Sequence, residues 1–385
     1  MTASRHRGSV AIVGVAESDL GQVAEGMTPA DLMGQAAARA LEDCGLALGD
    51  VDAAFAAATQ LNMPVLNLCE YLGIEPHYLD GTHIGGASFL SHLAHAQAAI
   101  EAGLCEVALI AYGSTQRSAG RSNAAPQEIS TYEAPYRPMH PVTAYALAAS
   151  RHMHEFGTTR EQLATVAVAA RQWALMNPAA WEKKPLSVAD VLASPMIANP
   201  LTVRDCCLVT DGGGALVVTS AERAKRLRKK PAYVLGAGES TTHRHVSGMP
   251  DLTGTAARES GSRAFGMAGL VPGDVDVAEI YDAFTINTVL FLEDLGFCAK
   301  GDGGRFIEGG RIAPGGALPV NTNGGGLSYC HPGMYGIFTL IEAVRQIRGE
   351  CGDRNVANCD VALAHGNGGV LSSQATVLLG SPATV

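Results

Sequence analysis

The sequence predicts a duplicated α/β fold, and an internal repeat is the main reason for this prediction. Residues 38–52 (ARALEDCGLALGDVD) match residues 262–276 (SRAFGMAGLVPGDVD) at eight positions, with a constant offset of 224 residues. Short apolar runs rich in β-branched residues alternate with helix-like segments in both copies, which is typical of sheets covered by helices. The first copy also carries a long insertion. The chain therefore reads as two similar halves, one of which is interrupted.

Three further pairs of segments recur in the same order. They are VGVAES (13–18) with LGAGES (235–240), GGAS (85–88) with GGLS (325–328), and CEVALIA (105–111) with CDVALAH (359–365). Each half is thus predicted to run strand, helix, a second strand after GDVD, then another helix and another strand. We expect two similar mixed sheets layered with helices, an N-terminal half over residues 8–230 and a C-terminal half over residues 231–385.

The insertion spans residues 115–200 and is rich in Met, Pro, Tyr and Arg. Long insertions in compact domains usually form lids or binding loops, so we expect this loop domain to cover the functional site. Arg117, Arg121 and Arg137 lie within it and are candidates for binding the phosphates of a ligand.

Composition excludes several classes of function. The net charge of −10 argues against a nucleic-acid partner, because such proteins concentrate Lys and Arg. Nine scattered cysteines without a C-x-x-C pair predict a reduced, cytoplasmic setting, and no run of about 20 apolar residues predicts a membrane span. The segment VLGAGEST (234–241) lacks the third glycine of a dinucleotide site, no P-loop motif occurs, and no histidine pair has the partners of a zinc site. We predict neither a metal nor a covalently bound cofactor.

Four segments are candidates for the functional site. Both GGxS segments precede a predicted helix, where free backbone N–H groups and the helix dipole stabilise negative charge. Because the halves are similar, their corresponding loops should converge. The site is expected to gather residues 81–89 (GTHIGGASF), 280–287 (IYDAFTIN), 323–336 (NGGGLSYCHPGMYG) and 363–369 (LAHGNGG).

These motifs resemble those of the thiolase superfamily over essentially the whole chain, above all its sterol-carrier-protein-type thiolases and thiolase-like lipid-transfer proteins. Thiolases carry a nucleophilic cysteine in a C-x-S-G turn, then N-E-A-F, G-H-P and C-x-G-G-G motifs. Here YDAF (281–284), CHP (330–332) and HGNGG (365–369) occupy the last three places. Residues 84–88 read IGGAS, so the nucleophilic thiol is missing from the first place. Tyr281 replaces the asparagine of N-E-A-F, and His365 replaces the second cysteine.

The resemblance implies cleavage of a carbon–carbon bond in an acyl-CoA thioester. A site that keeps the family's enolate-stabilising histidine, His331, and lacks the nucleophile suits retro-aldol lysis of a β-hydroxyacyl-CoA with a bulky acyl group, such as a steroid or aromatic one. Thiolase-type acyl transfer, as in acetyl-CoA acyltransferases, and non-catalytic binding of acyl-CoA or lipid are the alternatives. Coenzyme A would enter only as part of the substrate. The resemblance also implies a homodimer and a small partner subunit with an OB-fold and a zinc ribbon.

Ten residues are assigned to the site. His331 is expected to serve the thioester oxygen and Tyr281 the proton of the β-oxygen, with Tyr329 and His365 as further acid–base groups. The predicted substrate-binding residues are Gly85, Gly86, Gly325, Gly326, Asn367 and Gly368. Alternatives stay open: Tyr335 could replace Tyr329, Tyr281 and His365 could be structural, and Cys330 could be a displaced nucleophile.

Overall fold

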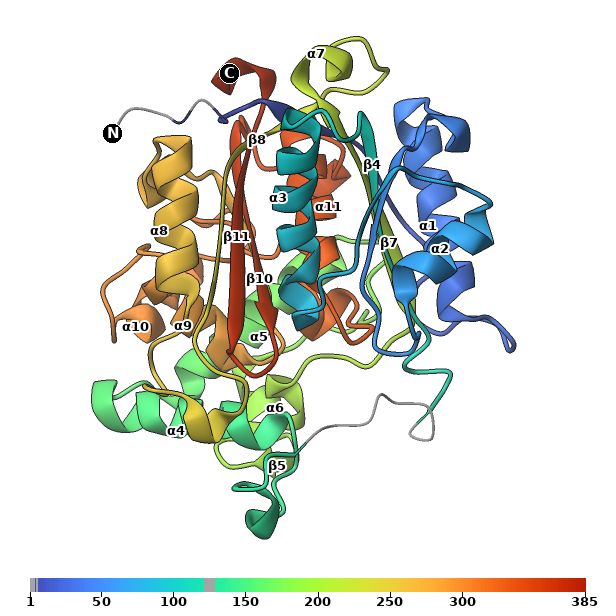
Figure 1. Ribbon diagram of the computed structural model, residues 1–385. Helices are drawn as coiled ribbons and strands as arrows, with labels where there is room; N and C mark the ends of the chain where they lie inside the picture. The colour runs from blue at the N-terminus through green and yellow to red at the C-terminus, as the bar shows by residue number, and fades with distance from the viewer. Residues whose placement is uncertain (1–3, 5, 121–128) are drawn as a thin grey trace.

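The computed structural model describes residues 4, 6–120 and 129–385, and it has five layers (Figure 1). From one side to the other these are an outer helix layer, a sheet, an inner pair of helices, a second sheet and a second outer helix layer. Helices α3 (Ser88–Glu101) and α11 (Gly336–Arg348) form the inner pair and contact strands of both sheets. Helix α8 (Ala257–Ala268) covers one outer face, while α1 (Pro29–Cys44) and α2 (Pro64–Leu72) cover the other.

The two halves contribute strands in mirrored order. The N-terminal half gives β1 (Val10–Glu17), β2 (Ala53–Ala56), β3 (Tyr78–Asp80), β4 (Val107–Ser114) and β7 (Gly212–Ser220). The C-terminal half gives β8 (Ala232–Thr241), β9 (Val277–Ile280), β10 (Val361–Gly368) and β11 (Ser373–Gly380). In the described residues the strand order is β3-β2-β4-β7-β1-β8-β11-β10-β9, so β2-β4-β7-β1 in one half corresponds to β9-β10-β11-β8 in the other. The predicted duplicated, mixed α/β fold is confirmed.

One detail differs from the expectation of two separate sheets. Strands β1 and β8 pair antiparallel through Ala11 with Tyr233 and Ile12 with Ala232, which joins the two sheets edge to edge. Each of these strands is the innermost strand of its half, so a short crossing is enough to make the sheet continuous. The division of the chain into domains at residue 231 stays a prediction.

The repeated residues hold equivalent positions in the two halves. The carboxylate of Asp52 accepts the N–H groups of Glu106 and Val107 before β4, and that of Asp276 accepts those of Asp360 and Val361 before β10. A Cβ on Gly14 would lie 2.1 Å from the carbonyl oxygen of Ala40, and one on Gly236 would lie 2.1 Å from that of Ala264. Glycine is therefore required where each outer helix crosses its strand.

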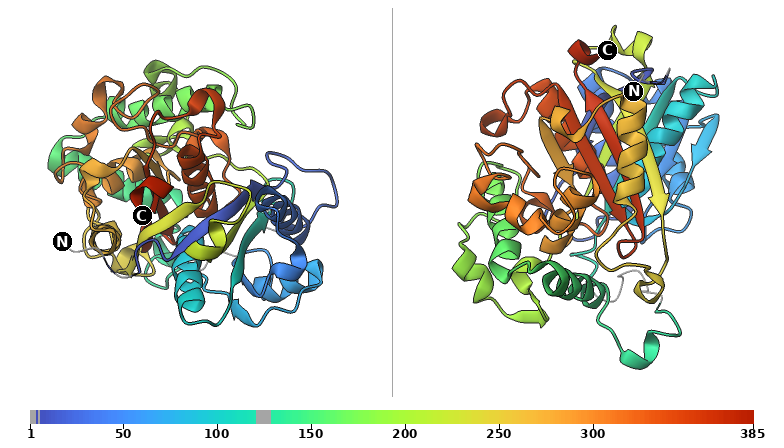
Figure 2. Two further views of the ribbon diagram at one scale, coloured as in Figure 1. Left: turned by 90° about the horizontal axis from the view of Figure 1, so that it is seen from above. Right: turned by 90° about the vertical axis from the view of Figure 1, so that its left-hand side faces the viewer.

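The insertion lies at one end of the layers, beyond the lower ends of α3, β10 and β11 in Figure 1, and both views of Figure 2 keep it to one side of the sheets. It contains α4 (Val142–Phe156), α5 (Arg160–Leu175), α6 (Val188–Leu192) and β5 (Met196–Ala198), which pairs with β6 (Leu201–Thr202). Helix α5 packs against α9 (Thr285–Asp294) and against a π-helical turn, η8 (Gly325–Tyr329). The remaining α-helices of the described residues are the short α7 (Ala221–Ala224) and α10 (Gly303–Phe306).

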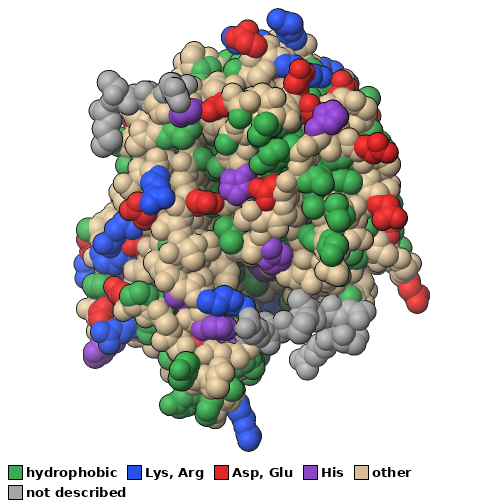
Figure 3. Space-filling model, in the orientation of Figure 1, with side chains coloured by type: hydrophobic (Ala, Val, Ile, Leu, Met, Phe, Trp, Pro, Cys, Tyr) green, Lys and Arg blue, Asp and Glu red, His purple; other side chains and the backbone are tan. Residues whose placement is uncertain are grey.

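Two observations concern the surface. On the face shown in Figure 3, Lys and Arg side chains lie among Asp and Glu side chains and form no single basic surface. Among the described residues, no helix combines the length and the apolar character needed to cross a membrane.

Candidate active site

Tyr281 and Gly86 bring together two of the predicted segments. Tyr281 directly follows β9, and Gly86 lies in η2 (Gly85–Ala87), the turn that opens α3. A Cβ on Gly86 would lie 2.1 Å from Cε2 of Tyr281 and 2.8 Å from the carbonyl oxygen of Asn367. The ring of Tyr281 thus fills the space that a side chain at the start of α3 would need.

The Tyr281 hydroxyl contacts His331. Its Oη atom lies 3.1 Å from Nε2 of His331 and accepts the backbone N–H of Tyr335, also at 3.1 Å. With the oxygen accepting from Tyr335, the hydroxyl proton is directed to Nε2 of His331 or to the carbonyl oxygen of Gly333, 3.4 Å away. The two residues therefore form a hydrogen-bonded dyad, whereas the sequence predicted that they serve opposite ends of the substrate.

Burial keeps both members of this dyad neutral. Loss of solvent lowers the pKa of His331 to about 4 and raises the pKa of Tyr281 well above its usual value. His331 is held in place by its backbone, since its N–H donates to Oγ1 of Thr210 at 3.0 Å and its carbonyl accepts the N–H of Thr210 at 3.3 Å. A proton that moves from the Tyr281 hydroxyl to His331 leaves an imidazolium, so a buried tyrosinate is avoided only if Tyr281 takes another proton in the same step.

Gly325 and Gly326 donate their backbone N–H groups to side chains of the protein. The N–H of Gly326 donates to Asp282 at 2.5 Å, and that of Gly325 donates to Oδ1 of Asn323 at 2.8 Å. A Cβ on Gly325, whose φ is 63°, would lie 2.0 Å from Oδ2 of Asp282. Burial raises the pKa of Asp282 to about 7, against the opposing effect of the backbone N–H groups of Gly326 and Leu327. The N–H groups of Gly325 and Gly326, which were predicted to bind substrate, thus donate to acceptors within the protein.

The start of α3 contacts the β10–β11 turn through Gly85, Asn367 and Gly368. A Cβ on Gly85 would lie 2.8 Å from Cα of Gly368, and one on Gly368 would lie 1.6 Å from the carbonyl oxygen of Ile84. These glycines allow two backbones to touch. The Asn367 side chain donates through Nδ2 to the Tyr145 hydroxyl at 2.9 Å and accepts from Nε2 of Gln374 at 2.8 Å.

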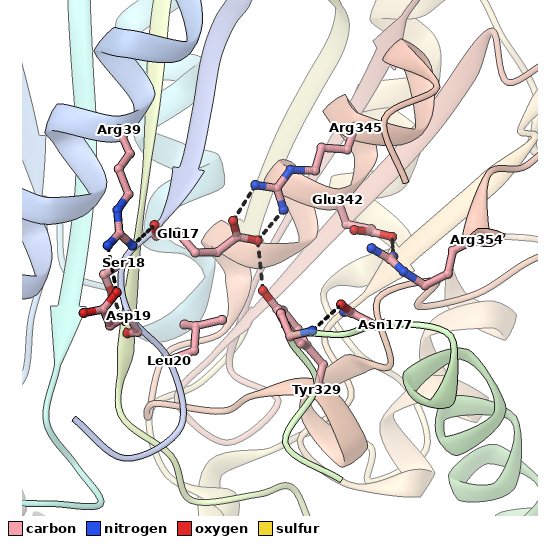
Figure 4. Close-up of a pocket in the computed structure, with 11 residues that line it drawn as sticks. Glu17, Ser18, Asp19, Leu20, Arg39, Asn177, Tyr329, Glu342, Arg345 and Arg354 are labelled. Carbon is pink, nitrogen blue, oxygen red and sulfur yellow. Dashed lines mark hydrogen bonds and ion pairs between the residues drawn. The ribbon is translucent and has the colours of Figure 1, made fainter. Parts of the chain in front are cut away.

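Tyr329 lies on the other side of the His331 loop. Its hydroxyl donates to Glu17 at 2.9 Å, and Glu17 also binds the guanidinium of Arg345 (Figure 4). These groups line a cavity of about 430 Å³ between the end of β1 and α11. The structure therefore does not bring the Tyr329 hydroxyl together with Tyr281 and His331. Tyr335 is nearer, since its ring stacks on His331 with centroids 6.2 Å apart.

His365 is enclosed in the core. Its Nδ1 atom lies 2.9 Å from Oγ1 of Thr376, its Nε2 atom lies 3.0 Å from Oε1 of Gln374, and its ring meets Phe291 edge-on. Burial lowers its pKa to about 3, so it is neutral. Both ring nitrogens are occupied, which fits the structural alternative; its catalytic role stays a prediction.

The thiols of the site are poor nucleophiles. Cys330 is buried and Cys207 is partly buried, and desolvation raises the pKa of each thiol well above its usual value. Among the described residues no group of three or more His, Cys, Asp or Glu could hold a metal ion.

Two of the three predicted phosphate-binding arginines lie in the part of the chain that the structure describes, and their surroundings differ. Arg117 stacks on Trp181 at 4.5 Å and donates to the carbonyl oxygen of Val209, Arg137 is exposed, and Arg121 lies outside the described residues.

Sequence reasoning missed three residues near the dyad. Tyr145 comes from α4 in the insertion, stacks on Phe284 with centroids 4.2 Å apart and had no motif to mark it. Cys207 lies close enough to raise the pKa of both Tyr281 and Tyr145. Asn287 ends the predicted segment IYDAFTIN, yet nothing in the sequence distinguished it from an ordinary helix residue, and its burial is seen only in the structure.

Comparison with known proteins identifies the family. The family model "Thiolase C-terminal domain-like" matches residues 238–381. The chain is 34% identical over 366 residues to the 17-hydroxy-3-oxo-4-pregnene-20-carboxyl-CoA lyase of Mycobacterium tuberculosis, covering 89% of this chain and 92% of that one. It is 32% identical to an acetyl-CoA acetyltransferase of Methanothermobacter thermautotrophicus, covering 94% and 96%. The solved Ltp2-ChsH2(DUF35) aldolase superimposes with a TM-score of 0.89 at 31% identity, covering 97% of this chain and 98% of that one.

A duplicated α/β fold with these relatives defines an enzyme of the thiolase superfamily, and the chain belongs to it. Within that superfamily it is an SCP2-thiolase-like protein. Relatives named as lyases and aldolases confirm the predicted class of reaction, carbon–carbon cleavage of an acyl-CoA.

Proposed function

We propose that this chain cleaves a β-hydroxyacyl-CoA by a retro-aldol reaction that forms no covalent intermediate. The observation that carries the proposal is the Tyr281 ring against Gly86, with its hydroxyl 3.1 Å from His331. Where a thiolase needs a nucleophilic thiol, this site has a phenol bonded to a neutral imidazole.

The reaction needs one proton relay. Tyr281 takes the proton of the β-hydroxyl as its own proton moves to Nε2 of His331. The O–H electron pair forms the carbonyl of the leaving aldehyde or ketone, and the Cα–Cβ pair moves onto the acyl fragment as a thioester enolate. The enolate carbon then takes the proton back from the relay, which restores the dyad and releases a shortened acyl-CoA.

The surroundings favour this charge flow. The first turns of α3 and α11 meet here, since a Cβ on Gly336 would lie 2.0 Å from the carbonyl oxygen of Gly86. Two helix N-termini therefore face the region in which the enolate develops, and their dipoles stabilise negative charge. Burial excludes water that would otherwise screen this interaction.

The substrate class follows from the relatives. Two of them are named for steroid substrates, one of which is a 17-hydroxy-20-carboxyl-CoA, so we propose a bulky acyl group, steroid or aromatic, with a hydroxyl on the β-carbon. Coenzyme A enters as part of this substrate, and the protein needs no covalently bound cofactor.

The test is incubation with β-hydroxyacyl-CoA thioesters of increasing bulk. The expected result is release of an aldehyde or ketone together with a shortened acyl-CoA. The relative named as an acetyl-CoA acetyltransferase makes acyl transfer the second candidate, and cleavage of a β-ketoacyl-CoA only when free CoA is added would favour it. Binding of acyl-CoA without either product would indicate a non-catalytic protein.

The assembly is also proposed. Strand β3 is at the edge of the sheet, with Leu79 42% exposed and Leu66 of the adjoining α2 49% exposed, which suits pairing with a second copy of the chain. The Ltp2-ChsH2(DUF35) aldolase is named as a complex with a DUF35 protein, which supports the partner subunit that the sequence resemblance implies, a small protein with an OB-fold and a zinc ribbon. Light scattering of the chain alone should give a dimer mass, and a monomer would contradict this proposal.

A further inference from the structure

Asn287 has an exceptional environment. It is the third residue of α9, its side chain has no exposed surface, and neither Nδ2 nor Oδ1 has a hydrogen-bond partner among the described residues. A buried amide without partners costs about 1–3 kcal/mol for each unpaired group, so such residues are rare unless a ligand or water completes them.

Intermediate residues connect Asn287 to the dyad. Its amide lies outside hydrogen-bond distance of the Tyr145 hydroxyl but close enough to oppose, together with Asn367, the effect of burial, which raises the pKa of Tyr145 to about 12. Tyr145 is bonded to Asn367, whose carbonyl oxygen and the Tyr281 ring both approach Gly86. Asn287 is thus connected to Tyr281 through a continuous set of contacts.

The polar neighbours of Asn287 are already committed to other groups. The Tyr145 hydroxyl accepts Nδ2 of Asn367 at 2.9 Å and donates to the carbonyl oxygen of Gly369 at 3.4 Å. Asn367 is in turn oriented by Gln374, and Gln374 by His365. This chain of hydrogen bonds fixes Tyr145 and leaves the Asn287 amide available.

The chemistry decides which oxygen of the substrate Asn287 suits. The β-oxygen must lose a proton and needs a group that can take it, such as the Tyr281–His331 dyad. The thioester oxygen gains negative charge and needs a donor that keeps its proton, and an amide N–H does not titrate near neutral pH. Asn287 also lies in the first turn of α9, where the helix dipole favours negative charge.

We propose that Nδ2 of Asn287 donates to the thioester oxygen of the bound acyl-CoA and stabilises the enolate formed on cleavage. This inference rests on the proposed retro-aldol function and supplies the oxyanion donor for it. It also moves this role from His331, whose Nε2 atom is engaged with Tyr281.

Asn287→Leu tests the proposal because it keeps the size and removes both polar groups. Without ligand, the free energy of unfolding should stay equal or rise, since an unpaired buried amide is replaced by an apolar group. The kcat for retro-aldol cleavage should fall by roughly 10²–10³, as for loss of one oxyanion donor. A mainly structural Asn287 predicts the reverse: lower stability and kcat within about threefold of the wild type.

Asn177→Leu is the matched control for stability. Asn177 is also buried, but its amide donates to the carbonyl oxygen of Asn323 at 2.9 Å and accepts the N–H of Ala179 at 3.0 Å. Its replacement should lower the free energy of unfolding by about 1–3 kcal/mol, because those partners lose their bonds. Equal destabilisation by both replacements would overturn the inference.

A binding measurement separates this inference from the proposed function. An acyl-CoA should bind less tightly to Asn287→Leu than to the wild type, while its thioether analogue, with CH₂ in place of the carbonyl, should bind both equally. That difference does not require turnover, so it can succeed even if no β-hydroxyacyl-CoA is cleaved. Equal loss for both ligands would show that Asn287 does not contact the thioester oxygen.

Discussion

Gly86 has no room for a side chain because the Tyr281 ring lies 2.1 Å from where its Cβ would be. The two positions are therefore coupled. Gly86→Ala should destabilise the protein by about 1–3 kcal/mol through overpacking. In a Tyr281→Ala background the same change should have a smaller effect, because only the contact with the carbonyl oxygen of Asn367, at 2.8 Å, remains. Denaturant unfolding of the four proteins in this double-mutant cycle measures the coupling, and additive effects would contradict the contact.

Tyr281→Phe should lose most of its turnover and keep its fold. The change removes the hydroxyl that bonds to His331 and leaves the Tyr335 N–H without its acceptor, so we expect a loss of about 1–3 kcal/mol in stability and of about 10²–10⁴ in kcat.

Tyr329→Phe is the matched control for this prediction, because its hydroxyl bonds to Glu17 and lies away from the dyad. It should retain near wild-type kcat. If Tyr329→Phe were inactive and Tyr281→Phe active, the base would be Tyr329.

No acyl-enzyme should accumulate. Residues 84–88 carry no thiol, and burial raises the pKa of the Cys330 thiol well above its usual value. Intact-protein mass spectrometry after incubation with acyl-CoA should therefore give the unmodified mass. An acyl adduct on Cys330 would favour a displaced nucleophile and a thiolase mechanism.

Asp282 should make the protein less stable as the pH rises. The pKa of the Asp282 carboxyl is about 7 in the folded protein, and its ordinary value of 3.8 applies to the unfolded chain. Between about pH 4 and pH 7, unfolding therefore releases a proton. As the pH rises through this range, the free energy of unfolding falls by up to about 1.4 kcal/mol per pH unit. Above about pH 7 this carboxyl causes no further change.

His331 and His365 act in the opposite direction over part of this range, because their lowered pKa values make stability fall as the pH drops below about 6.5. The comparison must therefore be made against Asp282→Asn, which removes only the carboxyl titration. The wild-type stability relative to this variant should decline from pH 4 to pH 7, and a pH-independent difference would rule out the raised pKa.

The repeat made the fold predictable from sequence, whereas the site was predictable only in part. Asp52 and Asp276 recur because each caps the start of a strand, and Gly14 and Gly236 correspond because a helix crosses each. Such local requirements leave a pattern in the sequence. The grouping of residues 81–89, 280–287 and 363–369 around Tyr281 follows from the same symmetry.

Side-chain direction could not be derived in this way. Tyr329 and His331 are two residues apart, yet the π-helical turn ends at Tyr329 and the chain is extended at Cys330, so the Tyr329 hydroxyl meets Glu17 and the His331 ring meets Tyr281. Asn287 was overlooked because an unpartnered amide is a property of its surroundings, and no spacing of residue types reports it.

The segments GGAS and GGLS began as equivalents, but the chain now treats them differently. Helix α3 begins at Ser88, the last residue of the first segment, whereas after residues 325–328 seven residues intervene before α11 begins at Gly336. Those seven residues contain Tyr329, His331 and Tyr335. A symmetric pair of helix starts has thus been made asymmetric by delaying one of them. The length of this delay is therefore a separate structural variable: the added residues supply the dyad's histidine, and Cys330, Met334 and Tyr335 among them also belong to the hydrophobic core.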